Sequence, residues 1–186
     1  MLPREVVKEY REGLIIGSAC EAGELYQAVR GGASDAELEE IASFYDYLEI
    51  QPTGNNMFLV RENICTLADL QEHNRKINEL GKRMGKLVVA TCDVHFLNPE
   101  DALLRAILQA GQNYKDADLQ PPLYLHTTEE MWDEVAYLGE EAAYEVVVTN
   151  TNKIADMVER FKPVPDRDQL YSPTIPGAED AVRNLS

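Results

Sequence analysis

Leu87-Val88-Val89-Ala90-Thr91-Cys92-Asp93-Val94-His95 is the stretch around which the rest of the chain can be interpreted. Its first four residues form an apolar run that predicts a short buried strand. Residues i and i+2 of an extended backbone point to the same side, so Asp93 and His95 would project together from the end of that strand. A carboxylate and an imidazole placed in this way can supply two ligands to one divalent cation. The same pattern also fits an Asp93 that caps the next turn and a His95 that is a satisfied polar residue.

The segments around this stretch alternate between apolar runs and helical patterns. The main strands are predicted near 14–18, 46–51 and 87–91, with a shorter fourth strand at 123–125. Helices are predicted at 3–12, 22–30, 34–45, 66–84, 98–110, 127–138 and 140–160. The first of these could equally be a charged arm, and three consecutive valines interrupt the last. This order predicts an α/β fold with parallel strands, either a small open sheet or part of a larger barrel.

Individual side chains refine this assignment. Ser34 and Glu37 have the spacing of a capping box at the start of a helix. His73 lies among the charges of the helix at 66–84 and is interpreted as a solvated position, whereas His126 is interpreted as structural or exposed. The short apolar piece at 57–60 could be extended. The helix at 98–110 carries an apolar stripe made of Leu103, Leu104, Ile107 and Leu108.

Composition narrows the class of protein. The chain has 186 residues and a formal charge of −16, so it should repel a phosphate backbone and is not expected to bind DNA or RNA directly. No apolar run approaches the roughly 20 residues of a membrane span, and the first residues lack the apolar core of a signal peptide. Three cysteines without framework spacing favour a reducing, cytoplasmic location.

The last part of the chain differs in composition from the rest. Four prolines, Pro163, Pro165, Pro173 and Pro176, interrupt any helical pattern there. We therefore expect one folded domain at 1–161 and an extended linker or arm at 162–186. The sequence contains no phosphate-binding glycine loop, no Gly-x-Ser-x-Gly elbow, no His-Glu-x-x-His helix and no Cys-x-x-Cys pair.

Five stretches, taken in order, resemble a known family. They are 13–21 (GLIIGSACE), 44–52 (FYDYLEIQP), 89–101 (VATCDVHFLNPED), 127–131 (TTEEM) and 137–141 (YLGEE). Together they closely resemble the PolC-type alpha subunit of bacterial DNA polymerase III, and the match runs through nearly the whole chain. The resemblance is to the later part of its polymerase and histidinol phosphatase (PHP) domain, just after the exonuclease insertion. The segment 162–186 resembles the lead into the polymerase palm.

The resemblance implies part of a distorted PHP-type βα barrel with metals at the C-terminal ends of its strands. Cys20, Asp93 and His95 match metal ligands of that family, which implies a bound zinc or manganese in the complete domain. Cys65 and Cys92 are expected to be structural. Glu49 could support the ligands from outside the metal's coordination shell, although a structural role fits it better.

The resemblance also implies a function for the parent protein. That protein would be a magnesium-dependent, DNA-directed DNA polymerase of chromosome replication, with DNA and replisome proteins as partners and a proofreading exonuclease in the same chain. The segment itself lacks the other motifs of these activities, so it is expected to be a structural, metal-binding part without catalysis of its own. The alternative is a stand-alone metal-dependent phosphoesterase of the PHP superfamily.

The final expectation concerns association. An incomplete barrel leaves strand edges and apolar sheet faces that need a cover. We therefore expect either a homodimer of the isolated chain or a sheet that is covered by the chain's own helices or N-terminal arm.

Overall fold

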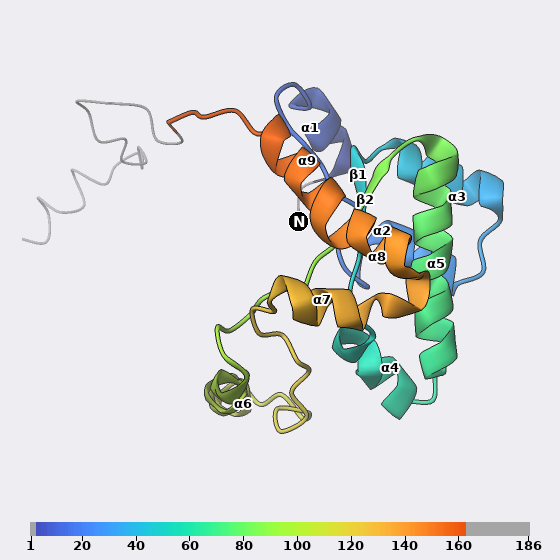
Figure 1. Cartoon of the computed structure of the whole chain (residues 1–186). Helices are drawn as coiled ribbons and strands as arrows, with labels where there is room; N and C mark the ends of the chain where they lie inside the picture. The colour runs from blue at the N-terminus through green and yellow to red at the C-terminus, as the bar shows by residue number, and fades with distance from the viewer. Residues whose placement is uncertain (1–2, 163–186) are drawn as a thin grey trace, which may run out of the picture.

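The computed structural model describes residues 3–162, so the arm predicted at 162–186 lies outside the described residues apart from Lys162. Within residues 3–162, a short parallel sheet is surrounded by helices, as Figure 1 shows. No helix in this part of the chain is both long enough and apolar enough to cross a membrane. The helices and the parallel pairing of the two strands confirm the predicted α/β class.

Two predicted strands pair in parallel. β1 (Tyr47–Ile50) and β2 (Leu87–Ala90) run side by side in the register Tyr47 to Leu87 and Ile50 to Ala90. The Thr91 N–H donates to the Ile50 carbonyl at 3.0 Å and so extends the pairing by one residue. Both strands therefore end at the same edge of the sheet, directly before the polar residues singled out in the sequence.

The strand predicted near 14–18 was largely wrong. This segment makes a single parallel bridge, between Gly17 and Tyr47, and Leu14 and Ile15 are 49% and 37% exposed rather than buried. A Cβ atom on Gly17 would lie 2.4 Å from Cζ of Tyr47, so only glycine allows the tyrosine ring to lie across this segment. The segment remains the third parallel neighbour of the sheet, but not as a regular strand.

Side chains replace the missing ladder hydrogen bonds. The Ile16 N–H donates to the Asp46 carboxylate at 2.6 Å, and the Glu49 N–H donates to Ser18 Oγ at 2.9 Å. These two backbone groups are therefore satisfied without a regular strand. In addition, Arg11 forms an ion pair with Asp46 at 2.6 Å.

The described residues form nine α-helices, most of which lie around the sheet. Their bounds are α1 (Arg4–Glu9), α2 (Glu24–Arg30), α3 (Asp35–Ser43), α4 (Met57–Arg61), α5 (Leu67–Met84), α6 (Ala102–Gly111), α7 (Thr128–Glu134), α8 (Glu140–Tyr144) and α9 (Asn150–Met157). Short 3-10 turns are η1 (Thr53–Asn56), η2 (Pro99–Asp101) and η3 (Ala136–Leu138), and η4 (Glu145–Thr149) is a π-helix. Helix α5 packs on β1 and β2, and η4 and α9 pack on β2.

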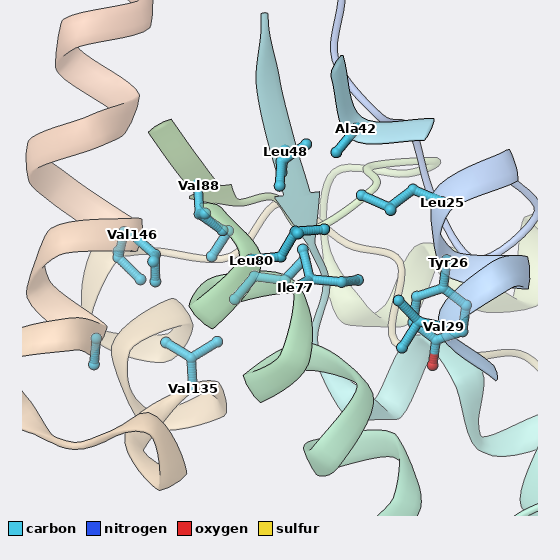
Figure 2. Close-up of a cluster of buried hydrophobic side chains, with 14 of the residues drawn as sticks. Leu25, Tyr26, Val29, Ala42, Leu48, Ile77, Leu80, Val88, Val135 and Val146 are labelled. Carbon is cyan, nitrogen blue, oxygen red and sulfur yellow. The ribbon is translucent and has the colours of Figure 1, made fainter. Parts of the chain in front are cut away.

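The core lies between the sheet, α2, α5 and the segment from α7 to η4. Figure 2 shows its side chains converging from these elements. Fully or almost fully buried members are Leu25, Val29, Leu48, Ile77, Leu80, Val88, Val135 and Val146. The chain's own helices thus cover its two strands, which is the second of the alternatives expected for the sheet.

Local start signals are reproduced in the structure. Ser34 and Glu37 form the predicted capping box of α3, and Thr66 with Asp69 forms another at the start of α5. Gly85 ends α5 in the left-handed conformation, with φ of 64°. These helix ends depend on residues three or four positions apart, which is why the sequence predicts them well.

Three further segments were predicted to be irregular or extended, and the structure decides the conformation of each. The piece at 57–60, which could have been extended from its sequence, instead continues from η1 as α4 and buries Leu59. The interruption predicted near 146–148 is confirmed as the π-helix η4. Directly after it, Asn150 donates to the Val88 carbonyl at 2.9 Å. The fourth strand is reduced to one parallel bridge, between Tyr124 and Phe96.

Helix α6 forms where predicted but lies apart from the other helices in Figure 1. None of its ten residues is buried. Two parallel strands and two single bridges within residues 3–162 do not establish a barrel, so the PHP-type barrel stays a proposal.

Candidate metal centre at the strand ends

Asp93 and His95 lie where the sequence places them, just beyond β2. Asp93 adopts a left-handed backbone, with φ of 51°, which aspartate tolerates better than most residues. His95 Nδ1 lies 3.9 Å from Asp93 Oδ1 and 2.7 Å from the Asp93 carbonyl oxygen. A carbonyl can only accept a hydrogen bond, so this contact favours the tautomer with hydrogen on Nδ1. In that tautomer Nε2 keeps its lone pair for a metal ion.

Cys20 lies on the neighbouring segment, three residues after the Gly17 bridge, and is partly buried. Burial raises the pKa of the Cys20 thiol, and the negative charges of Glu21 and Asp93 raise this pKa further, while a hydrogen bond from the Ala22 backbone opposes them. A bound cation would reverse this balance and favour the thiolate.

Glu49 connects the strand ends. Its carboxylate accepts hydrogen bonds from Thr91 Oγ1 at 2.9 Å and from Gln51 Nε2 at 3.5 Å, and its N–H donates to Ser18. Burial raises the pKa of Glu49, the Thr91 hydrogen bond lowers this pKa, and the charge of Asp93 raises it again. Because Glu49 ties segments at the ends of both strands together, the contacts support the structural role expected for it.

The side chains of Cys20, Asp93 and His95 are of the chemical types that bind a divalent metal, but their positions do not form a complete metal site. Thiolate, imidazole and carboxylate together are the ligands of zinc sites. Among residues 3–162, however, no group of three or more His, Cys, Asp or Glu side chains is close enough to hold a metal ion. The structure thus brings Asp93 and His95 together, whereas it places Cys20 only on the segment that neighbours β1. No catalytic step follows from this arrangement.

All three cysteines are free thiols. Cys92 packs against the hydrophobic core, and its carbonyl oxygen accepts a hydrogen bond from Asn55 Nδ2 at 3.2 Å. Cys65 is partly buried beyond α4, and its N–H donates to the Leu59 carbonyl at 3.4 Å. These contacts agree with the structural roles expected for Cys65 and Cys92.

His73 is not a solvated position, so that prediction was wrong. It is 9% exposed, its Nδ1 lies 3.3 Å from the Tyr26 hydroxyl, and the two rings pack edge to face. Burial lowers the pKa of His73. The spacing could have revealed this, because His73 comes three residues after Leu70 and four before Ile77 and therefore shares their buried face. His126, in contrast, is structural as expected and stacks on Tyr124 at 4.0 Å.

Sequence reasoning missed a set of buried amides next to the strand ends. Asn74 of α5 donates to the Gln51 carbonyl at 2.8 Å and lies 2.6 Å from the Tyr137 hydroxyl. Asn55 and Asn56, in the turn after β1, are 6% and 2% exposed. These groups fix the turn after β1 against α5, which is a structural contribution to this edge of the sheet.

Comparison with known proteins finds relatives that share one name. No protein-family model matches the chain. Three curated proteins, each called "DNA polymerase III PolC-type", match all of it: those of Clostridium perfringens (61% identical over 186 residues), Caldanaerobacter subterraneus subsp. tengcongensis (55% over 186) and Bacillus subtilis (43% over 189). The chain spans only about 13% of the length of these relatives.

Proposed function

We propose that this chain is part of a replicative DNA-directed DNA polymerase, because its sequence corresponds throughout to a segment of PolC-type DNA polymerase III. The observation that carries the proposal is the sequence identity, which extends over the whole chain and is not confined to one motif. Within that polymerase, residues 1–161 would form the later portion of the PHP domain and residues 162–186 the connection towards the palm.

The role proposed for the segment is structural and metal-binding. Cys20, Asp93 and His95 would hold zinc or manganese in the complete domain. The 3.9 Å separation of Asp93 Oδ1 and His95 Nδ1 and the free Nε2 that the His95 contact implies support this proposal, and Cys20 follows the segment that bridges to β1. When bound, the metal would neutralise the negative groups that face one another at the strand ends, and Glu49 would keep those ends together.

The segment is proposed to lack polymerase, exonuclease and phosphoesterase activity of its own. The parent polymerase would use magnesium, bind DNA and replisome proteins through its other parts, and act on the chromosome in the cytoplasm. A formal charge of −16 argues against direct binding of DNA by this segment. The experiment for the parent function is primer extension with magnesium by the polymerase that contains this chain, and a polymerase without extension activity would contradict the proposal.

Metal binding is tested on the purified chain by zinc titration in a calorimeter and by metal analysis after purification. The double variant Asp93→Asn with His95→Gln and the single variant Cys20→Ser should each weaken zinc binding by at least about tenfold. Asp118→Asn changes an exposed carboxylate away from the strand ends and serves as the matched control. Equal zinc affinity in the wild type and in both ligand variants would refute the site.

Phosphate release from a phosphomonoester, measured with manganese or zinc, separates the proposal from the alternative. Release that is lost in the ligand variants would indicate a stand-alone phosphoesterase. Zinc binding without phosphate release would support a metal that stabilises the fold.

A further inference from the structure

A small pocket lies between the segment that follows β1 and the loop that follows α6. Its volume is about 170 Å³. The first segment contributes Asn55, Phe58 and Arg61 to the lining, and the second part of the chain contributes Arg105 of α6 and Tyr114, among others. Pockets that hold a whole drug-sized ligand measure about 300–1,000 Å³, so this pocket has room for a single chemical group.

The two arginines of this pocket lack the partners that other arginines have. Four arginines elsewhere in the described chain each form an ion pair with a carboxylate, namely Arg4, Arg11, Arg75 and Arg83. Within residues 3–162, neither Arg61 nor Arg105 forms such a pair, and Asp116, the acidic residue of the lining, pairs with neither. Acidic residues outnumber basic ones by 33 to 17, so carboxylates are not in short supply. The pocket thus carries two positive charges that the described residues leave without an ion pair.

Arg105 is held in position by neutral side chains. Its Nη1 donates to Gln120 Oε1 at 2.6 Å, and Gln120 Nε2 donates to Gln109 Oε1 and to the Ala117 carbonyl, each at 2.6 Å. Among the described residues, the hydrogen bonds of Arg105 use Nη1 alone. The edge formed by Nε and Nη2 therefore keeps its N–H groups for an anion, in the planar fork that matches phosphate and carboxylate oxygens.

The other residues of the lining provide a fixed and partly apolar surround. Asn55 is 6% exposed, and its Nδ2 donates to the Cys92 carbonyl at 3.2 Å. Phe58 is partly buried and gives the pocket an apolar wall, which strengthens charge contacts because it excludes water. Arg61 is the last residue of α4 and is exposed, so an anion can reach it from the solvent.

Charge favours a phosphate group as the occupant. A phosphomonoester carries about −1.5 to −2 charges at pH 7 and three acceptor oxygens, which match two guanidinium groups. A carboxylate carries one charge and two oxygens, and a single arginine is sufficient to bind both oxygens. The DNA backbone brings many charges at once, and a chain with a formal charge of −16 repels it.

We propose that this pocket binds the phosphate group of inorganic phosphate or of a small phosphomonoester through Arg61 and Arg105. The site is distinct from the candidate metal centre, because Cys20, Asp93 and His95 do not line the pocket. Phosphate binding therefore needs no metal ion.

Calorimetric titration of the purified chain in the presence of a metal chelator tests the proposal, with inorganic phosphate and glycerol phosphate as probes. Saturable binding is expected. It should become tighter as pH rises from about 5 to about 7.5, because the second negative charge of a phosphate group forms in this range. Acetate should bind at least about tenfold more weakly than phosphate. Binding of both phosphate probes would identify the ligand as a phosphomonoester group, and binding of inorganic phosphate alone would identify it as the free ion.

Arg61→Gln should weaken phosphate binding by at least about tenfold, since it removes one of the two charges that contact the anion. Arg30→Gln is the matched control, because Arg30 also ends a helix, α2, without an ion pair among the described residues, and does not line the pocket. This control loses the same charge and should bind phosphate like the wild type.

Two further measurements separate this site from the metal centre and from an effect of substitution on the fold. The double variant Asp93→Asn with His95→Gln should bind phosphate like the wild type. In the wild type, the NMR signal of Arg105 Nε–H should shift as phosphate is added, which needs no variant. The proposal would be overturned by an absence of phosphate binding, by equal affinity in the wild type and Arg61→Gln, or by acetate that binds as tightly as phosphate.

Discussion

Helices α5 and α6 both have an apolar stripe in the sequence, but the stripe of α5 is buried and that of α6 is exposed. Leu70, Ile77 and Leu80 of α5 are at most 1% exposed. The apolar stripe of α6 is at least 60% exposed at each of its four residues, Leu103, Leu104, Ile107 and Leu108. Helical periodicity is similar in kind for the two helices. The difference shows that periodicity indicates which face of a helix favours burial. It does not indicate whether other segments of the same chain pack against that face.

The cover of α5 comes from segments on both sides of it in the sequence. It packs against β1 and α2, which precede it, and against β2, which follows it. Helix α6 belongs to the connection between β2 and α7, and its hydrogen bonds go to the loop that follows it. A helix whose side-chain hydrogen bonds go to the adjoining loop can satisfy its polar side there, but that short loop does not bury a row of leucines.

Removal of a leucine from each helix should give the largest contrast. Leu80→Ala in α5 should lower the free energy of unfolding by about 2–5 kcal/mol, because it leaves a cavity in a packed core. Leu104→Ala in α6 should change this free energy by at most about 0.5 kcal/mol, since the side chain is mostly exposed. Urea unfolding of both variants at a low, monomeric concentration measures the two values. A loss in Leu104→Ala as large as that in Leu80→Ala would mean that α6 is packed within the monomer.

A methyl group added to a glycine of each helix should give effects of opposite sign. A Cβ atom on Gly81 of α5 would lie 2.2 Å from Cγ2 of Val88, so Gly81→Ala should destabilise the chain by about 1–3 kcal/mol. Gly111, at the end of α6, has open space around that position, so Gly111→Ala should stabilise the chain by up to about 1 kcal/mol.

Thermal or urea unfolding of the two glycine variants, compared with the wild type, gives the signs. If Gly81→Ala were neutral, the close approach of α5 to β2 would be in doubt. If Gly111→Ala were destabilising, the open surroundings of the end of α6 would be in doubt.

The smallest expected effect concerns pH. Burial lowers the pKa of His73 in the fold below its unfolded value of about 6.5. The unfolded chain therefore takes up the proton first, and stability is lost as pH falls through about 6.5 towards the folded pKa. His73→Gln should make unfolding free energy less dependent on pH between about 7.5 and 5.5. Leu104→Ala changes no titrating group, so its pH dependence should match that of the wild type. An unchanged pH dependence in His73→Gln would contradict the burial of a neutral His73.

In the candidate site, as in the two helices, some features follow from local sequence and others depend on distant segments of the chain. Asp93 and His95 were predicted to lie together because an extended backbone projects residues i and i+2 to one side. They do lie together, with Asp93 Oδ1 and His95 Nδ1 3.9 Å apart, but the backbone at Asp93 is left-handed and not extended, and only Val94 separates the two residues. Cys20 could be selected only through a family resemblance, since 73 residues separate it from Asp93 and nothing local links the two. The support that Glu49 receives from Ser18 and Thr91 likewise depends on pairing between distant segments.

By itself the sequence determined the local features of this protein: the helix starts at Ser34 and Thr66, the apolar run of β2, the interruption at the three valines 146–148 and the family. Each depends on residues close together in the chain or on similarity along its whole length. Only the tertiary structure decided that the segment near 14–18 forms one bridge, that His73 is buried and that α6 stays uncovered. Burial is a property of what packs against a residue, and those neighbours come from parts of the chain that no local pattern identifies.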